Sequence, residues 1–155
     1  MTVSVEPWLA APLARFVTEA RVRLAIVLET NGRVLAQHGF SRSLDVMSAC
    51  ALAAALHATA TELGTQLEGV PFGALHHVGR SQQIFLATLS LAPRALLLLA
   101  VFEDSSSLGL VRLFSAELRQ CAGAAVAAPA PRGEALAADF EVELNRNLAA
   151  LFGRT

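Results

Sequence analysis

The chain has 155 residues and a mass of 16.3 kDa, of which 54% are hydrophobic and only 16% charged. This length fits one domain with a short appendage, and the composition excludes disorder for most of it. The net charge of -1 argues against a nucleic-acid-binding surface, which is normally basic. The sequence has no lysine, which excludes a P-loop nucleotidase and Schiff-base chemistry.

The high apolar content needs a membrane segment or a large shared interface. The longest central stretch without Asp, Glu or Arg is 46–61, which is shorter than the ~18–20 residues of a membrane span. The N-terminus has neither the basic region nor the apolar region of a signal peptide. Cys50 and Cys121 form no CxxC motif and are expected to be reduced thiols. We therefore expect a cytoplasmic protein that is an obligate oligomer.

The first elements are predicted to be a helix and a two-stranded hairpin. Apolar residues of 7–20 recur at helical spacing, with Pro7 in the first turn. Residues 22–29 are apolar on both faces, which is typical of a central strand covered on both sides. Asn31-Gly32 is a strong turn signal, and it leads into a second strand over 33–38.

Residues 44–66 are predicted to form a long central helix, with Ser43 or Asp45 as its N-cap. One face is bulky, and we expect it to dock on the sheet; it carries Leu52, Leu56, Leu63 and Leu67. The opposite face holds small and weakly polar residues, namely Met47, Cys50, Ala54, His57, Ala58 and Thr61. A helix that is apolar all round is buried on both sides. We therefore predict that the second face is a partner-binding surface or dimer seam.

Three more strands and a helix complete the expected domain, residues 1–127. The strands are expected at 72–78, 82–91 and 95–102, with turns between them, and the helix at 108–127, capped by the serines of 105–107. Short connections favour an antiparallel sheet. The predicted fold is an α/β (α+β) sandwich: a five-stranded antiparallel sheet with helices on both faces, in the order α-β-β-α-β-β-β-α.

A tail is expected beyond this domain. Residues 128–133 form a Pro-rich linker, and 134–155 are predicted to form an amphipathic C-terminal recognition helix. Its apolar positions recur every three or four residues at Leu136, Phe140, Leu144, Leu148 and Leu151.

The sequence carries no recognisable catalytic motif. It has no HExxH, no GxSxG and no glycine-rich phosphate loop, and its four histidines are not spaced as metal ligands. We expect no catalytic residues, no metal and no cofactor. His57 is expected to be an interface residue.

Residues 100–113, Ala-Val-Phe-Glu-Asp-Ser-Ser-Ser-Leu-Gly-Leu-Val-Arg-Leu, resemble the last strand, turn and helix start of the roadblock family, the dynein-light-chain-type regulators. The chain looks most like the family's bacterial polarity regulators of the MglB type. The first hairpin at 24–32, the Ala-rich helix at 45–64 and the tail at 143–152 extend the resemblance. Ala51-Leu52 stand where the family usually has Gly-Asn.

The resemblance implies a homodimer in which the central helices pair antiparallel and the edge strands join two sheets. It also implies binding of a Ras-like small GTPase of the MglA type and stimulation of GTP hydrolysis. This stimulation would act by reorganising the switch regions of the GTPase, without an inserted arginine. Two other functions stay open: a roadblock scaffold subunit that does not stimulate hydrolysis, and a small-ligand-binding module.

Overall fold

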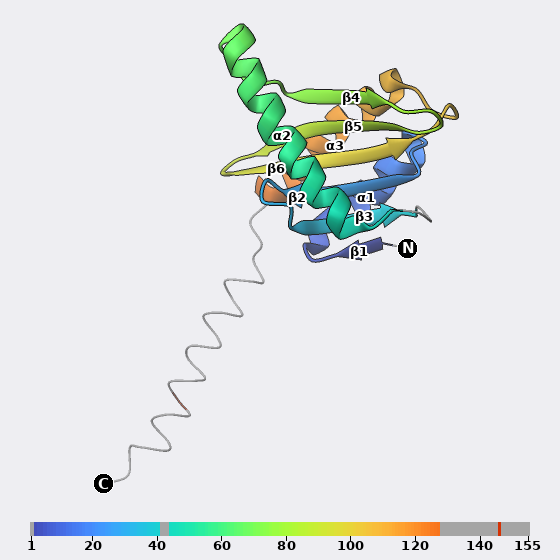
Figure 1. Ribbon diagram of the computed structural model, residues 1–155. Coiled ribbons are helices and arrows are strands. Elements are labelled where there is room, and N and C mark those ends of the chain that lie inside the picture. The colour runs from blue at the N-terminus through green and yellow to red at the C-terminus, as the bar shows by residue number, and fades with distance from the viewer. Residues whose placement is uncertain (1, 41–43, 128–145, 147–155) are drawn as a thin grey trace.

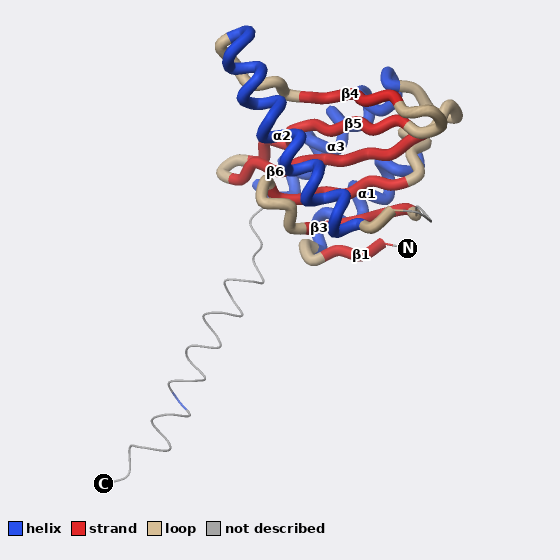
Figure 2. The backbone as a smooth tube through the Cα atoms, in the orientation of Figure 1, coloured by secondary structure: helices blue, strands red, loops and turns tan. Residues whose placement is uncertain are grey.

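The computed structural model describes residues 2–40, 44–127 and 146 (Figure 1). A single antiparallel sheet has α1 and α3 on one face and α2 on the other (Figures 1 and 2). The helices are α1 (Pro7–Glu19), α2 (Val46–Glu68) and α3 (Leu108–Ala127). The strands are β1 (Thr2–Ser4), β2 (Leu24–Glu29), β3 (Val34–Gly39), β4 (Ala74–Val78), β5 (Gln83–Leu91) and β6 (Arg94–Phe102).

All five predicted strands form, and their order in the sheet is β3-β2-β6-β5-β4. The structure adds a sixth strand that the sequence analysis missed. β1 pairs antiparallel with β3 at the outer edge, with Thr2 opposite His38 and Ser4 opposite Ala36. Three residues are too few to show a period of two, so only the long-range pairing with β3 defines this strand.

The two central strands separate two cores, as their continuous apolar runs predict. In β6, alternate side chains point to opposite faces of the sheet. Leu98, Ala100 and Phe102 belong to the core under α1 and α3. Leu97 and Leu99 belong to the core under α2. Residues Leu24 to Leu28 of β2 are fully buried, so both faces of the sheet centre are covered.

The caps of α2 and α3 follow the sequence. The Asp45 carboxylate accepts a hydrogen bond from the Met47 N–H at 3.2 Å and one from the Ser48 hydroxyl at 2.6 Å. These bonds, that from Ser48 first, lower the pKa of Asp45. The helix ends at Gly69, which adopts a left-handed φ of 76°. In α3, the Ser107 hydroxyl accepts from the Leu110 N–H at 3.2 Å, as predicted for this serine turn.

The predicted orientation of α2 is wrong. Leu52, Leu56, Leu63 and Leu67, expected to face the sheet, are exposed; we call them the outer leucine row. The residues that α2 buries are small, namely Cys50, Ala53 and Gly64. A helix can approach a sheet most closely through a face with small side chains. The small face of α2 therefore packs on the sheet, and its leucine face remains exposed.

Helix α2 is also the one described helix long and apolar enough to cross a membrane by length and composition. The uncharged stretch 46–61 is shorter than a membrane span, but the helix continues to Glu68. In the structure, this helix packs one face on the sheet of the same domain. The linker and recognition helix predicted for 128–155 lie outside the described residues, except for Arg146.

Candidate functional site

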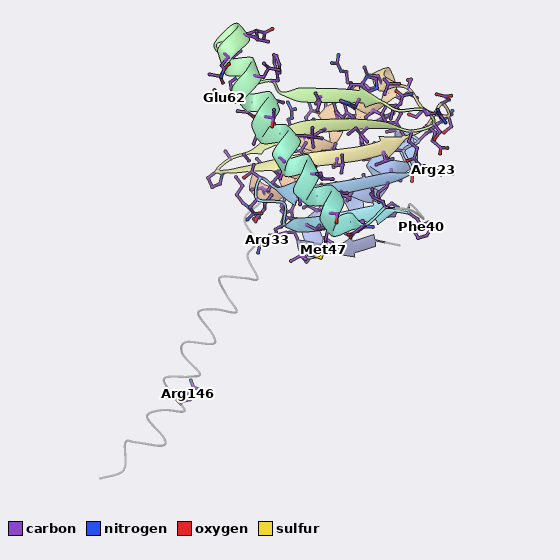
Figure 3. All side chains as sticks on the ribbon, in the orientation of Figure 1. Arg23, Arg33, Phe40, Met47, Glu62 and Arg146 are labelled. Atoms are coloured by element: carbon purple, nitrogen blue, oxygen red, sulfur yellow. The ribbon has the colours of Figure 1, made fainter. Side chains whose placement is uncertain are left out.

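The outward face of α2 is an apolar surface that no other described element covers. Only three of its 23 residues are buried. Leu52 is 66% exposed, Leu63 is 49% exposed and Leu67 is 68% exposed. Monomeric surfaces rarely expose apolar side chains in one contiguous row, and such patches mark interaction sites. Figure 3 shows this helix lying across the sheet, with Met47 near its start and Glu62 in its second half.

Gly64 brings α2 against the segment that follows it. A Cβ built on Gly64 would lie 2.6 Å from the Phe72 nitrogen and 2.8 Å from the Val70 oxygen. Backbone atoms cannot yield as a flexible side chain can, so this position accepts only glycine without a shift of the chain. The glycine therefore fixes how the second half of α2 sits beside β4.

The predicted seam residues of α2 do not lie together on one surface. Cys50 is fully buried, and burial raises the pKa of its thiol. Ala54, His57 and Thr61 are half-buried, whereas Met47 is 80% exposed and Ala58 is exposed.

The two polar residues of this set are directed differently. His57 lines a cavity of about 10 Å³ together with Phe72, Leu75 and Leu86, so it faces the sheet. The Thr61 hydroxyl oxygen is buried and has no hydrogen-bond partner. Of the six predicted residues, Met47 and Ala58 are thus the most available to a partner.

Strand β4 forms the edge of the sheet next to α2, and it pairs on one side with β5. The Gly79 N–H donates to the Gln82 carbonyl at 2.8 Å, and the Thr88 N–H donates to the Gly73 carbonyl at 3.0 Å. Odd-numbered residues therefore turn their backbone groups toward β5, and even-numbered residues turn theirs outward. An edge with unpaired N–H and C=O groups is a template for another strand. The resemblance to the roadblock family implies edge strands that join two sheets, and β4 is one of the two edge strands of the described sheet.

A cluster of charged side chains links the start of α1, the end of β2 and the start of β6. The Arg94 guanidinium contacts the Glu6 carboxylate at 3.1 Å and the Glu29 carboxylate at 2.8 Å. Arg33 pairs with Glu29 at 2.9 Å, and the Trp8 indole N–H donates to Glu6 at 2.9 Å. The hydrogen bond from Trp8, then that from Arg94, lowers the pKa of Glu6. Hydrogen bonds from Arg33, then from Arg94, lower the pKa of Glu29.

This cluster predicts an acid-dependent loss of stability. Carboxylates whose pKa is lowered by folding stabilise the fold above the unfolded-state pKa near 4.5, and this contribution is lost as the pH falls through the folded-state value. We expect Arg94→Ala to lower the Tm by a few degrees at pH 7 and by less at pH 3. Thermal unfolding of both proteins at the two pH values measures this; equal differences at both would contradict it.

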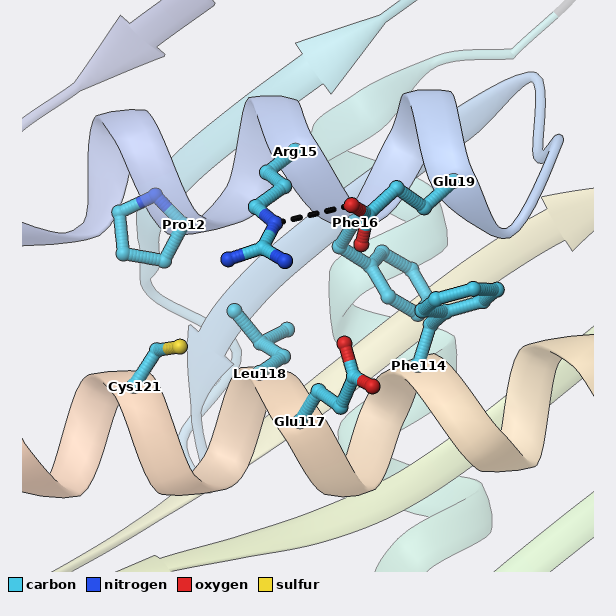
Figure 4. A pocket seen from close by; sticks show the side chains of 8 residues that line it. All are labelled: Pro12, Arg15, Phe16, Glu19, Phe114, Glu117, Leu118 and Cys121. Carbon is cyan, nitrogen blue, oxygen red and sulfur yellow. Dashed lines mark hydrogen bonds and ion pairs between the residues drawn. The ribbon is translucent and has the colours of Figure 1, made fainter.

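The described residues hold no built catalytic pocket. An indentation between α1 and α3 is lined by Pro12, Arg15, Phe16, Glu19, Phe114, Glu117, Leu118 and Cys121 (Figure 4). Its volume of about 20 Å³ has room for a single water molecule, and Arg15 is paired with Glu19 at 2.9 Å. Within the described part of the chain, no three His, Cys, Asp or Glu side chains gather as metal ligands.

Comparison with known proteins identifies the fold. No protein-family model matches the sequence, and no curated protein sequence matches it. Solved structures of other proteins, in contrast, match this chain. The chain is similar to Myxococcus xanthus MglB, with a TM-score of 0.67 and 21% identity over 76% of this chain and 86% of that one. It is similar to a gliding protein MglB from Thermus thermophilus, with a TM-score of 0.69 and 20% identity over 80% and 92%.

A roadblock/LC7 domain from Streptomyces avermitilis gives a TM-score of 0.58 and 20% identity over 73% of this chain and 90% of that one. These identities establish a common fold and no more. The structure contains the three helices and five strands expected within the domain and adds β1, so the roadblock resemblance is confirmed at the level of the fold. This chain has the roadblock/LC7 fold, in the form most like that of the MglB proteins.

Proposed function

We propose that this protein is a homodimeric regulator of a Ras-like small GTPase of the MglA type, acting in the cytoplasm in cell polarity or motility. The observation that carries this proposal is the outer leucine row, an exposed apolar face on a roadblock/LC7 fold. In this proposal the protein has no active site of its own and acts by binding.

The dimer forms through α2 and β4. Two α2 helices pack antiparallel along their outer leucine rows, and the free edges of two β4 strands join the sheets. Both features lie on the same side of the domain, where α2 passes the β4 edge (Figure 1). One of the MglB structures with this fold is described as a tetrameric arrangement, which supports self-association in proteins of this architecture.

The GTPase binds on the part of α2 that the dimer leaves open. At about 100° per residue, Met47 and Ala58 lie on the far side of α2 from Leu56. They stay accessible when the outer leucine row is covered. In our proposal the tail residues Leu136, Phe140, Leu144, Leu148 and Leu151 add a second contact, as an amphipathic helix that enters a groove of the GTPase.

Stimulation of hydrolysis is indirect in this proposal. Arg94 is held by Glu6 and Glu29, so it is not free to reach a nucleotide. Arg80 is exposed in the turn between β4 and β5, and Arg42 lies outside the described residues. An arginine inserted into a GTPase site contributes ~10³–10⁵ in kcat. We therefore expect Arg80→Ala and Arg42→Ala each to change stimulated GTP turnover less than tenfold.

The test combines binding and turnover with a purified Ras-like GTPase loaded with GTP, with a non-hydrolysable GTP analogue, or with GDP. We expect tighter binding of the GTP forms, accelerated turnover, and weaker binding after deletion of 134–155. A drop of 10³ or more for either arginine variant, with binding intact, would overturn the indirect mechanism.

Binding without acceleration would favour the scaffold function. The ligand-binding alternative has less support. Among the described residues, two hollows have room for about 10–20 Å³, and a third of about 490 Å³ is a groove open to solvent along α2, lined by Ala58, Thr59, Glu62, Leu63 and Gln66.

A further inference from the structure

The last turn of α2 has no cover among the described residues. Thr65, Gln66, Leu67 and Glu68 are all exposed, and four consecutive residues complete one turn of a helix. Figure 1 shows this end of α2 extending past β4, beyond the edge of the sheet. Leu67, an apolar side chain in this turn, is 68% exposed. A molecule that covers Leu67 therefore has to approach from the β4 side of the domain.

A groove open to solvent, of about 490 Å³, runs along the same half of α2. Its lining residues all belong to this helix: Ala58, Thr59, Glu62, Leu63 and Gln66. The Gln66 side-chain amide donates to the Glu62 carboxylate at 2.8 Å, so these two polar side chains are bonded to each other along the helix. Leu63 is the large apolar side chain of the lining. Since α2 alone supplies this lining, a partner is needed to cover Leu63.

The outer leucine row is symmetric about its own midpoint. Its members are spaced by four, seven and four residues, at Leu52, Leu56, Leu63 and Leu67. At about 100° per residue, they lie within about 60° of one another around α2. The midpoint of the row falls between Thr59 and Ala60. A second α2 turned by a twofold axis through this midpoint places Leu56 opposite Leu63 and Leu52 opposite Leu67. The row therefore matches an antiparallel copy of itself.

The charges of α2 favour the same arrangement. Glu62 and Glu68 are its only residues among Asp, Glu, Arg and Lys, and both lie in the second half of the helix. A parallel pair would bring Glu62 beside Glu62 of the second copy, and like charges across an interface disfavour association. An antiparallel pair places each Glu62 beside the first half of the other helix, which has no carboxylate. Leucine spacing and charge thus select the same orientation.

We infer that the outer leucine row selects a second copy of this chain as its partner, with the twofold axis at the midpoint of the row. This inference rests on the proposed homodimer and defines the register of its α2 contact. Leu56 of each copy packs on Leu63 of the other, at the groove. The projecting Leu67 of each copy reaches Leu52 of the other. A helix with a different leucine spacing would leave one of these pairs unmatched, so the row is a specificity element for self-association.

A charge pair at the centre of the contact tests the inference. Leu56→Arg combined with Leu63→Glu places a guanidinium opposite a carboxylate twice in the dimer. Within one helix these positions are about 10 Å apart, so the new charges pair only between copies. We expect the dimer Kd, measured by sedimentation velocity, to be about tenfold or more below that of Leu56→Arg alone. Leu56→Arg combined with Leu113→Glu has the same net charge, but its carboxylate lies on α3, and it should show no recovery. Equal Kd values for the two double variants would overturn the inference.

Cross-linking tests the register separately, in a Cys121→Ser background because Cys121 is exposed. Thr59 lies beside the axis and is exposed. With helix axes about 8–10 Å apart, the two Thr59 Cα atoms come about 5–7 Å apart, which a disulfide can span. We expect Thr59→Cys to form a disulfide-linked dimer under mild oxidation. Ala55→Cys and Glu62→Cys, about one turn away on either side, should not, because each Cα is more than about 10 Å from its copy in this register.

The outcomes separate the register from the dimer. A natural sequence that stays monomeric at all concentrations would refute the proposed homodimer itself. A dimer that cross-links through Ala55→Cys or Glu62→Cys in place of Thr59→Cys pairs in another register and overturns the inference. A dimer that cross-links at none of the three positions, and whose Kd is unchanged by Leu56→Arg, uses another surface and also overturns it.

Discussion

A single charge in the outer leucine row is expected to convert the proposed dimer to a monomer. Leu56→Arg places a guanidinium in the middle of the proposed α2–α2 contact, and the twofold axis brings a second one close to it. An unpaired charge in a desolvated interface costs about 3–5 kcal/mol. We expect the dimer Kd to rise about 100- to 1000-fold or more, as measured by sedimentation velocity over a range of concentrations.

The isolated domain should tolerate this change. The side chains of the outer leucine row are exposed, and substitutions at exposed positions usually alter the free energy of unfolding by about 0.5 kcal/mol or less. Leu113→Arg is the control, because Leu113 is also an exposed leucine, 55% exposed against 38% for Leu56, and lies on α3, on the opposite face of the sheet. It should leave the dimer intact. If Leu56→Arg stays dimeric at the natural affinity, the outer leucine row is not the dimer contact.

Gly64→Ala should destabilise the protein, although the same change usually stabilises a helix. Alanine in a helix interior is favoured over glycine by about 1 kcal/mol. At Gly64 the new Cβ would come 2.6 Å from the Phe72 nitrogen, and overpacking of this kind costs about 1–3 kcal/mol. The two nearest atoms, the Phe72 nitrogen and the Val70 oxygen, both belong to the backbone and cannot move aside easily. We therefore expect the clash to outweigh the helix preference and to lower the free energy of unfolding by about 1–2 kcal/mol.

Gly123→Ala is the control for this prediction. Gly123 also lies inside a helix, but a Cβ there would have the Leu91 side chain as its nearest neighbour, at 3.9 Å. We expect it to stabilise the protein by up to about 1 kcal/mol. Urea unfolding of the two variants measures the change in the free energy of unfolding, which we expect to have opposite signs for Gly64→Ala and Gly123→Ala. Stabilisation by both changes would show that the contact between α2 and Phe72 is looser than described.

The sequence by itself determined the elements whose signals are local. The runs at 22–29 and 95–102 indicated central strands, because both of their faces are apolar and need cover. Cap candidates at Ser43 or Asp45 and at the serines of 105–107 indicated the helix starts, because a capping side chain bonds to backbone in the first turn, and the structure selects Asp45 and Ser107. The position of the long helix between the hairpin and the last three strands, and hence the fold, followed from these.

Only the tertiary structure decided which face of α2 is free. Helical periodicity divides α2 into a leucine face and a small face, but both are apolar, and hydrophobicity cannot rank them. The choice depends on how closely the helix approaches the sheet at Cys50, Ala53 and Gly64, which is a long-range packing property. Pairing across the sheet likewise decided that β1 and β4 are the two edge strands of the described sheet, and that Arg94 is held by Glu6 and Glu29. Those partners are far apart in the chain, and no local pattern records them.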